Sequence, residues 1–257
     1  MRTEAFIIHL PRAKQRRKQV EALLAGLPLP TSVIDAVDGR ALSDAEVSAV
    51  YRRSLHRPHY PFELSRGEIG CFLSHRRVWQ AIVDRQLDAG LIVEDDVEPD
   101  AALFPRALKL ALAQIQPGDY VRFGFRSHTD AGRTVATGDG ATLVKPTKVG
   151  LGTQMQLVGR QAAMELLKST NLFDRPVDTT IQMQWLRPVR ILAARPVCIR
   201  QIDHLLGGTV VQKAGKPLSE VLSREVKRTL YRLSLRTVAM TKGASNGDRR
   251  SPPAPRP

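Results

Sequence analysis

The sequence is poor in cysteine and in aromatic residues, and it has no long apolar run. Its two cysteines, Cys71 and Cys198, lie far apart in apolar surroundings, so we expect reduced, packed thiols and no disulfide framework. Aromatic residues make up 5% of the chain, which leaves few platforms for stacking nucleobases. The apolar stretch at residues 5–8 is too short for a secretory core or a membrane span. We therefore expect no segment to cross a bilayer.

Basic residues outnumber acidic ones. The 39 lysines and arginines exceed the 25 aspartates and glutamates, which gives a formal net charge of +14 over 257 residues. Such a charge indicates a partner that carries phosphate, and it suits nucleic acid, an anionic membrane surface or a nucleotide-linked substrate equally well. With 42% hydrophobic residues, the chain is long enough to bury the core of one large α/β domain with a tail.

The most informative segment is an apolar run that ends in three consecutive carboxylates, Glu94, Asp95 and Asp96. Three like charges at a strand end are costly to hold unless a cation or a row of donors neutralises them, and a divalent metal is the simplest explanation. Upstream, residues 65–68 have the spacing of a capping box and open a helix that we predict from about 68 to 86, before Gly90. This order places the carboxylates at the carboxyl end of a strand, where open α/β sheets bind ligands.

The rest of the chain up to residue 217 alternates between strand and helix patterns. We predict strands near residues 4–10, 32–37, 119–124 and 153–158, and helices near residues 12–25, 101–115 and 161–168. Residues 52–61 read as a mobile loop, and residues 126–140 as a surface hairpin or an active-site loop. These patterns predict one α/β domain over residues 1–217 with a central, mostly parallel sheet.

The character of the chain changes at residue 218, where nine basic residues stand against three acidic ones. We predict a basic amphipathic helical region over residues 218–244 and a disordered tail over residues 245–257, rich in Pro, Arg and Ser. The apolar positions near helical spacing are Leu222, Val226, Leu230, Leu233 and Val238.

Two blocks of sequence resemble a known enzyme family. Residues 64–75 read Leu-Ser-Arg-Gly-Glu-Ile-Gly-Cys-Phe-Leu-Ser-His, residues 91–96 read Leu-Ile-Val-Glu-Asp-Asp, and together they resemble glycosyltransferase family 25. This family contains bacterial lipooligosaccharide biosynthesis enzymes and is related to the collagen galactosyltransferases. Weaker similarity extends over roughly residues 4–208 and excludes the tail. Two departures are His9, where asparagine is common, and Met155 or Gln156, where an aromatic residue often follows the Gly-Thr pair.

The resemblance implies a GT-A-like (Rossmann-like) fold that binds a nucleotide sugar, commonly UDP-galactose. It also implies a divalent metal, Mn²⁺ or Mg²⁺, and inversion at the anomeric carbon. The acid-x-acid spacing of Glu94 and Asp96 sends both side chains to one side of an extended segment, while Asp95 points elsewhere. We predict Asp96 as a direct metal ligand, with Glu94 or Asp95 at the ribose, the metal or its waters. The alternative is a solvated acidic turn that caps the next helix. His204, late in the chain, is a further candidate ligand.

Basic residues are the candidates for binding the donor diphosphate. Arg12, Arg16 and Arg17 belong to the predicted first helix, and we expect one of them to contact the nucleotide while the others form a solvated face. Arg66 and His75 flank the acidic strand in the family's pattern and are further donor-site candidates. A packed core histidine is the alternative for His75. A zinc site at His56 and His59 is weakly supported, because no cysteine accompanies them.

Asp178 is the candidate catalytic base, because inversion by direct displacement needs a carboxylate to take the proton of the acceptor hydroxyl. An ordinary helix-capping aspartate is the alternative. The leading hypothesis is a metal-dependent, inverting hexosyltransferase that acts in lipopolysaccharide or lipooligosaccharide synthesis at the cytoplasmic face of a bacterial inner membrane. Its basic helix would bind anionic lipid. The rival is a basic nucleic-acid-binding protein or a metal-dependent nuclease, and a third reading is an inactive relative.

Overall fold

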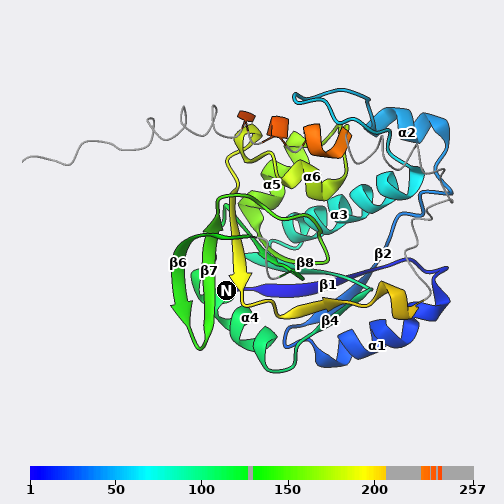
Figure 1. The fold of residues 1–257 in the computed structure, drawn as a ribbon. Helices are drawn as coiled ribbons and strands as arrows, with labels where there is room; N and C mark the ends of the chain where they lie inside the picture. Colours follow the sequence, from blue (N-terminus) through cyan, green and yellow to red (C-terminus); the bar gives the residue numbers. More distant parts are fainter. Residues whose placement is uncertain (127–129, 207–226, 232, 236, 239–257) are drawn as a thin grey trace, which may run out of the picture.

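The computed structural model describes residues 1–126, 130–206, 227–231, 233–235 and 237–238, which form a mixed sheet between two layers of helices (Figure 1). The strand order is β2-β1-β3-β8-β5-β9-β7-β6, and only β8 and β7 run opposite to the other strands. The predicted α/β fold with a mostly parallel sheet is therefore confirmed. The strands of this sheet are β1 (Thr3–His9), β2 (Thr31–Asp35), β3 (Ala89–Glu94), β5 (Asp119–Phe123), β6 (Gly132–Gly138), β7 (Ala141–Pro146), β8 (Met155–Gly159) and β9 (Arg190–Arg195).

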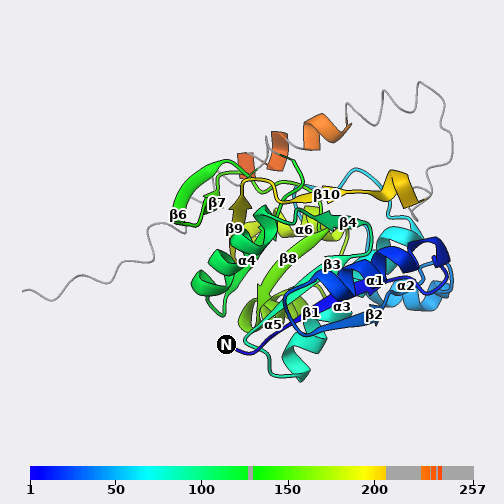
Figure 2. The ribbon, with the colours of Figure 1, turned by 90° about the horizontal axis from the view of Figure 1, so that it is seen from below.

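Helices cover both faces of the sheet. Figures 1 and 2 show α1 and α4 on one face and α3, α5 and α6 on the other. A small second sheet pairs β4 (Val97–Pro99) with β10 (Ile199–Gln201). The helices are α1 (Arg17–Gly26), α2 (Asp44–Val50), α3 (Arg66–Asp84), α4 (Leu103–Gln114), α5 (Arg160–Ser169) and α6 (Val177–Ile181), with short turns η1 (Lys14–Arg16), η2 (Gln184–Leu186) and η3 (Asp203–Leu206).

Each face of the sheet has its own core, because successive side chains of a strand point to opposite sides. On β1, Ile7 packs in the core under α1 and α4, and Phe6 packs in the core under α3 and α5. The capping box predicted at residues 65–68 is present, with the Ser65 side chain accepting from the Glu68 backbone N–H. It sets the start of α3, whose buried face includes Phe72, Trp79 and Ile82. The start of this helix is thereby held at the edge where β3 ends.

Two glycines let α3 lie directly against the loop that follows β2. A Cβ atom on Gly39 would stand 1.8 Å from the Arg66 carbonyl oxygen, and one on Gly70 would stand 2.6 Å from the Val37 carbonyl oxygen. The Ser74 hydroxyl also accepts a hydrogen bond from the Val37 backbone N–H at 2.8 Å. Backbone therefore packs on backbone here, and the position of the loop at residues 36–40 is fixed by α3.

The described residues between 227 and 238 are helical, and they contact the domain through residues that the predicted apolar face does not include. Tyr231 and Leu235 are buried in a cluster with Met183. The Tyr231 hydroxyl accepts a 2.7 Å hydrogen bond from Arg175, which is itself buried and paired with Asp174. On the outer side of the same segment, the predicted apolar residues Leu230 and Leu233 are 59% and 51% exposed. The predicted tail at residues 245–257 lies outside the described residues.

Among the described residues, no helix combines the length and the apolar composition that a membrane span requires. The two cysteines are both free, as expected. The glycine-containing segment after residue 130 forms the β6–β7 hairpin at the outer edge of the sheet, so of the two predicted alternatives the surface hairpin is confirmed.

Candidate functional site

A pocket of about 480 Å³ lies at the carboxyl ends of β1, β2 and β3, which run parallel. The three carboxylates at the end of β3 form its floor. The loop at residues 36–40 and the first turns of α3 form the facing walls. The side chains and backbone that line it are Ile8, Leu10, Arg12, Arg16, Ala36, Val37, Asp38, Gly39, Arg40, Ser65, Gly67, Cys71, Ser74, His75, Glu94, Asp95, Asp96, Gln154 and Gln201.

Asp95 is the buried member of the triplet, and its two oxygens already have partners. His9 Nδ1 lies 2.7 Å from one oxygen, and Arg16 donates to the other. Arg16 is turned inward by η1, which replaces the first turn of the predicted helix, so this arginine is only 4% exposed. Burial opposes its charge, but Asp95 and then Asp96 raise the pKa of Arg16 above its usual range. Asp95 thus ties β3 to β1 and to η1.

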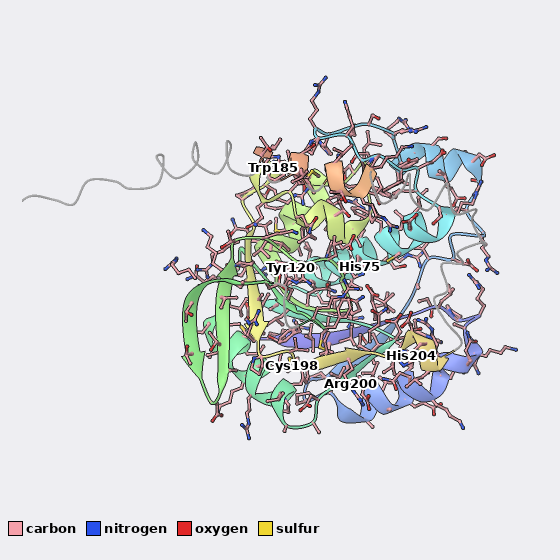
Figure 3. All side chains as sticks on the ribbon, viewed as in Figure 1. His75, Tyr120, Trp185, Cys198, Arg200 and His204 are labelled. Carbon is pink, nitrogen blue, oxygen red and sulfur yellow. The ribbon has the colours of Figure 1, made fainter. Side chains whose placement is uncertain are left out.

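Glu94 is held by partners on its other side. His75 Nε2 and the Thr153 hydroxyl each lie 2.9 Å from the same oxygen of Glu94. Burial works against the charge of Glu94, but the hydrogen bond and the charge of His75 lower its pKa below the usual range. Glu94 is therefore a negatively charged side chain held in a fixed orientation at the carboxyl end of β3. Figure 3 shows His75 near the middle of the molecule, on α3 above the sheet.

Of the three carboxylates, Asp96 lies where a negative charge is least favourable. Its Oδ2 is 3.3 Å from Arg16, and its Oδ1 is buried without a hydrogen-bond partner among the described residues. Burial and the neighbouring charge of Glu94 outweigh Arg16 and raise the pKa of Asp96 to about 7. A buried carboxylate oxygen without a donor, beside a second carboxylate, is what a hard divalent cation would satisfy. The donor set therefore fits Mn²⁺ or Mg²⁺, with Asp96 and Glu94 as its holders.

The end of the described domain returns to this site. The Ile202 backbone N–H donates to the Asp96 carbonyl at 2.8 Å, and the charge of Asp203 contributes to the raised pKa of Asp96. His204 lies on the same turn with its side chain 69% exposed, and its Nδ1 is 3.9 Å from Asp203 (Figure 3). Asp203, next to the predicted ligand His204, is therefore the residue of this turn whose charge acts on Asp96.

Only some of the predicted donor-binding arginines line the pocket. Arg12 lines the pocket at 38% side-chain exposure and donates to Asp38 at 2.5 Å, which lowers the pKa of that carboxyl. Arg17 is exposed and is not among the residues that line the pocket. Arg66 lies outside the pocket lining as well, where it bonds the Leu42 carbonyl and Asp44 and so holds α2 against α3. Of the predicted arginines, Arg12 and Arg16 are therefore the ones placed to meet an anion in the pocket.

Asp178 lies next to the pocket, in the first turn of α6, although it is not among the residues that line it. Its two oxygens accept from the Gly152 backbone N–H at 3.0 Å and from the Thr179 backbone N–H at 2.6 Å. Its charge, with those of Glu94 and Asp96, contributes to holding the pKa of the Cys71 thiol well above the usual value, after the larger effect of burial. The negative charge of Asp178 therefore reaches the interior of the pocket.

Sequence reasoning missed several residues that shape the site. Asp38, Gln154 and Cys71 line the pocket without having been singled out for it. In the sequence, Cys71 reads as a packed thiol. The only available signal for Cys71 was its place four residues before His75 on the predicted helix, which puts both on one face.

Comparisons with known proteins identify a family for most of the chain. Residues 2–181 match the family model described as Glycosyltransferase family 25 (LPS biosynthesis protein). The chain is 37% identical over 110 residues to procollagen galactosyltransferase 2 of Homo sapiens, a match that covers 42% of this chain and 18% of the human protein. It is also 36% identical over 97 residues to inactive glycosyltransferase 25 family member 3 of Mus musculus, covering 37% of this chain and 16% of that protein. The matched region thus spans less than a fifth of the length of these relatives.

The fold was also compared with solved structures. A glycosyltransferase involved in glycosylation of the major capsid of PBCV-1 aligns with a TM-score of 0.34 and 12% identity, over 64% of this chain and 63% of that one. Mannose-1-phosphate geranyltransferase from Thermus thermophilus aligns with a TM-score of 0.41 and 12% identity, over 75% of this chain and 73% of that one.

Proposed function

Since the chain belongs to glycosyltransferase family 25, we propose that it is a metal-dependent, inverting glycosyltransferase that transfers a hexose from a UDP-sugar to a saccharide acceptor. Galactose is the proposed hexose, because several similar proteins carry the name galactosyltransferase. The observation that carries the proposal is the pair Glu94 and Asp96 at the floor of a pocket large enough for a nucleotide sugar, with one buried Asp96 oxygen left without a donor among the described residues.

The pocket has separate surfaces for the parts of the donor. The ends of β1 and β2 supply an apolar wall at Ile8 and Val37, suited to the base, and Arg12 and Arg16 supply positive charge for the diphosphate. Asp96 and Glu94 would hold Mn²⁺ or Mg²⁺, which supplies charge neutralisation for the departing diphosphate. The negative charge that develops on the diphosphate leaving group would thereby be stabilised by the cation and the two arginines together.

Asp178 is the proposed base. Its carboxylate is oriented by two backbone N–H groups and by the Thr179 hydroxyl, which leaves a lone pair on Oδ2 to accept the proton of an acceptor hydroxyl. Gly152 bonds Asp178 while the next residue, Thr153, bonds Glu94, so one short loop holds the base and the floor of the pocket in a fixed relation. The rings of Tyr60 and Phe62, 5.6 Å apart, lie near this side, where burial and then the charges of Glu68 and Asp178 raise the pKa of Tyr60. They offer an apolar surface for an acceptor sugar.

The acceptor is proposed to be a glycan or glycolipid of lipopolysaccharide or lipooligosaccharide synthesis, and the basic helix at residues 227–238 is proposed to bind an anionic membrane surface. Lys227 is exposed on that segment, and so are Leu230 and Leu233, so the outward side combines positive charge with apolar contact area. Co-sedimentation with vesicles containing phosphatidylglycerol tests this, compared with phosphatidylcholine vesicles. Binding that survives Leu230→Ser with Leu233→Ser would contradict it.

Donor binding and turnover test the enzyme itself. We expect calorimetry with UDP-galactose and Mn²⁺ to give heat with the parent protein and with Glu21→Gln, an exposed carboxylate on α1, and none with Asp96→Asn. Asp178→Asn should keep the donor heat but lose about 10² to 10⁴ in UDP-galactose hydrolysis, because the acceptor water loses its base. Equal heats for the parent and Asp96→Asn would remove the metal from the proposal, and unchanged hydrolysis in Asp178→Asn would remove the base. A panel of UDP-sugars then identifies the hexose.

A further inference from the structure

We propose that the pocket contains an alternative cation position, selective for thiophilic divalent ions such as Zn²⁺, formed by Cys71, His75 and Glu94 and sharing Glu94 with the position proposed at Asp96. Cys71 and His75 are four residues apart on α3, so they share one face of the helix, and Glu94 faces them from the end of β3. One ligand atom from each of the three, the sulfur, a ring nitrogen and a carboxylate oxygen, lies within 4.8 Å of the others. All three residues line the pocket.

The chemistry of this ligand set differs from that of the carboxylate floor. Mn²⁺ and Mg²⁺ prefer oxygen ligands, whereas a thiolate together with an imidazole favours Zn²⁺ and its softer relatives. Three protein ligands leave the fourth position of a tetrahedral ion open, here toward the pocket. The two positions would therefore favour different ions, and because both use Glu94 the two ions would compete.

The surrounding charges favour a cation in place of the thiol proton. The negative charges of Glu94, Asp178 and Asp96 all act on the Cys71 sulfur. Their potential attracts a divalent ion, and the bound ion compensates the charge of the thiolate that forms. Binding releases the thiol proton to the buffer as the sulfur–metal bond forms, and the proton on His75 Nε2 is lost to the buffer or moves to Nδ1 as that nitrogen binds the ion.

The neighbouring residues are arranged to orient these ligands. His75 is 1% exposed and its Nε2 already points at the Glu94 carboxylate, 2.9 Å away, so both groups face the same space. Thr153, which precedes β8, donates to Glu94 at 2.9 Å and would still hold the carboxylate when His75 gives up its hydrogen bond to bind an ion. The site therefore requires little rearrangement beyond the loss of one hydrogen bond.

Occupation of this position would block the reaction, because its three ligands line the space assigned to the sugar nucleotide. This consequence rests on the proposed function, whereas binding of the ion does not. A thiophilic ion would thus act as an inhibitor in the presence of saturating Mn²⁺, and its effect would depend on Cys71.

The experiment uses Cd²⁺ as the probe, because a cadmium–thiolate bond gives a charge-transfer absorption band in the ultraviolet. Full-length, reduced protein is titrated as the parent, as Cys71→Ser and as Cys198→Ser. Cys198 is the matched control, since it is a buried free thiol that lies well away from His75 in Figure 3. We expect the band in the parent and in Cys198→Ser, its absence in Cys71→Ser, and its persistence in Asp96→Asn.

A second variant keeps the test independent of any folding defect in Cys71→Ser. His75→Gln retains the thiol and should weaken Cd²⁺ binding by about tenfold or more. No band in the parent, an equal band in Cys71→Ser, or an unchanged affinity in His75→Gln would each overturn the proposal. Zn²⁺ should also inhibit UDP-galactose hydrolysis more strongly in the parent than in Cys71→Ser, with each protein measured against its own rate without Zn²⁺. If the parent shows no hydrolysis at all, the proposed function fails while the cadmium result still decides the metal site.

Discussion

Replacing Asp96 by asparagine should stabilise the metal-free protein at alkaline pH while removing its response to Mn²⁺. The folded protein raises the pKa of Asp96 from 3.8 to about 7. Between those values the folded state keeps a proton that the unfolded chain has lost, so the unfolded chain binds fewer protons there. The free energy of unfolding therefore falls as the pH rises from about 4 to about 7 and stays low above that range. Asparagine is neutral at every pH and escapes this loss.

The size of the effect follows from the pKa difference. A difference of about 3 pKa units at about 1.4 kcal/mol each is a cost of about 4 kcal/mol at pH 8. Asparagine also loses the attraction between Asp96 and Arg16, which are 3.3 Å apart in the structure, and this reduces the gain. We expect a net gain of about 2 to 4 kcal/mol at pH 8, which for a protein of this size raises the melting temperature by about 5 to 10 °C.

Urea unfolding followed by the fluorescence of Trp79, which is fully buried, measures the change. The parent and Asp96→Asn are compared at about pH 4 and about pH 8, with and without Mn²⁺, and Glu21→Gln is the control for loss of an exposed carboxylate. The stability gain should appear at pH 8 and nearly vanish at pH 4, and Mn²⁺ should stabilise only the parent and the control. A loss of stability at pH 8, or an equal gain at both pH values, would refute the reasoning.

Two further predictions concern the parts that hold the site in place. Arg16→Met should lower the free energy of unfolding in urea by about 3 to 5 kcal/mol, because it leaves Asp95 buried without its cation. Arg17→Met, at the exposed neighbouring position, should change this free energy by no more than about 0.5 kcal/mol. A small loss in Arg16→Met would show that His9 alone suffices to neutralise Asp95. Gly39→Ala should displace the loop at residues 36–40, since its Cβ would meet the Arg66 carbonyl oxygen at 1.8 Å. Both the stability of the protein and its affinity for the donor should therefore fall. Gly26→Ala, with nothing within 4 Å of its Cβ, should change neither. Unaltered donor affinity in a folded Gly39→Ala protein would contradict the role given to this contact.

The local elements that carry the floor of the site were predictable from the sequence. The capping box at Ser65 fixed the start of α3, and the apolar run before Glu94 fixed β3, because both patterns depend on neighbouring residues alone. What local patterns could not supply was the direction of β8. Its run at residues 155–159 reads as a buried strand in either orientation, and only the pairing with β3 and β5 makes it antiparallel.

Within the site, the different surroundings of the three carboxylates could not be predicted from the sequence. Adjacent acids look equivalent in a sequence, but Asp95 is neutralised by His9 and Arg16, which come from segments 86 and 79 residues away. Long-range partners of this kind also decide that Arg66 braces α2 while Arg16 turns inward. The short helix α2 was missed too, although Ser43 and Glu46 form a capping box of the same type as the one that was recognised.

The contact between Tyr231 and Arg175 has a practical consequence for anyone who shortens this chain. Cutting after residue 217, where the composition suggests that the compact part ends, would strip Arg175 of its phenol partner and uncover Met183 together with the flanks of Tyr60 and Trp185. The truncated protein would expose an apolar patch beside the Arg175 cation, and it would tend to self-associate during purification. Expression designs should therefore keep the chain through at least residue 238.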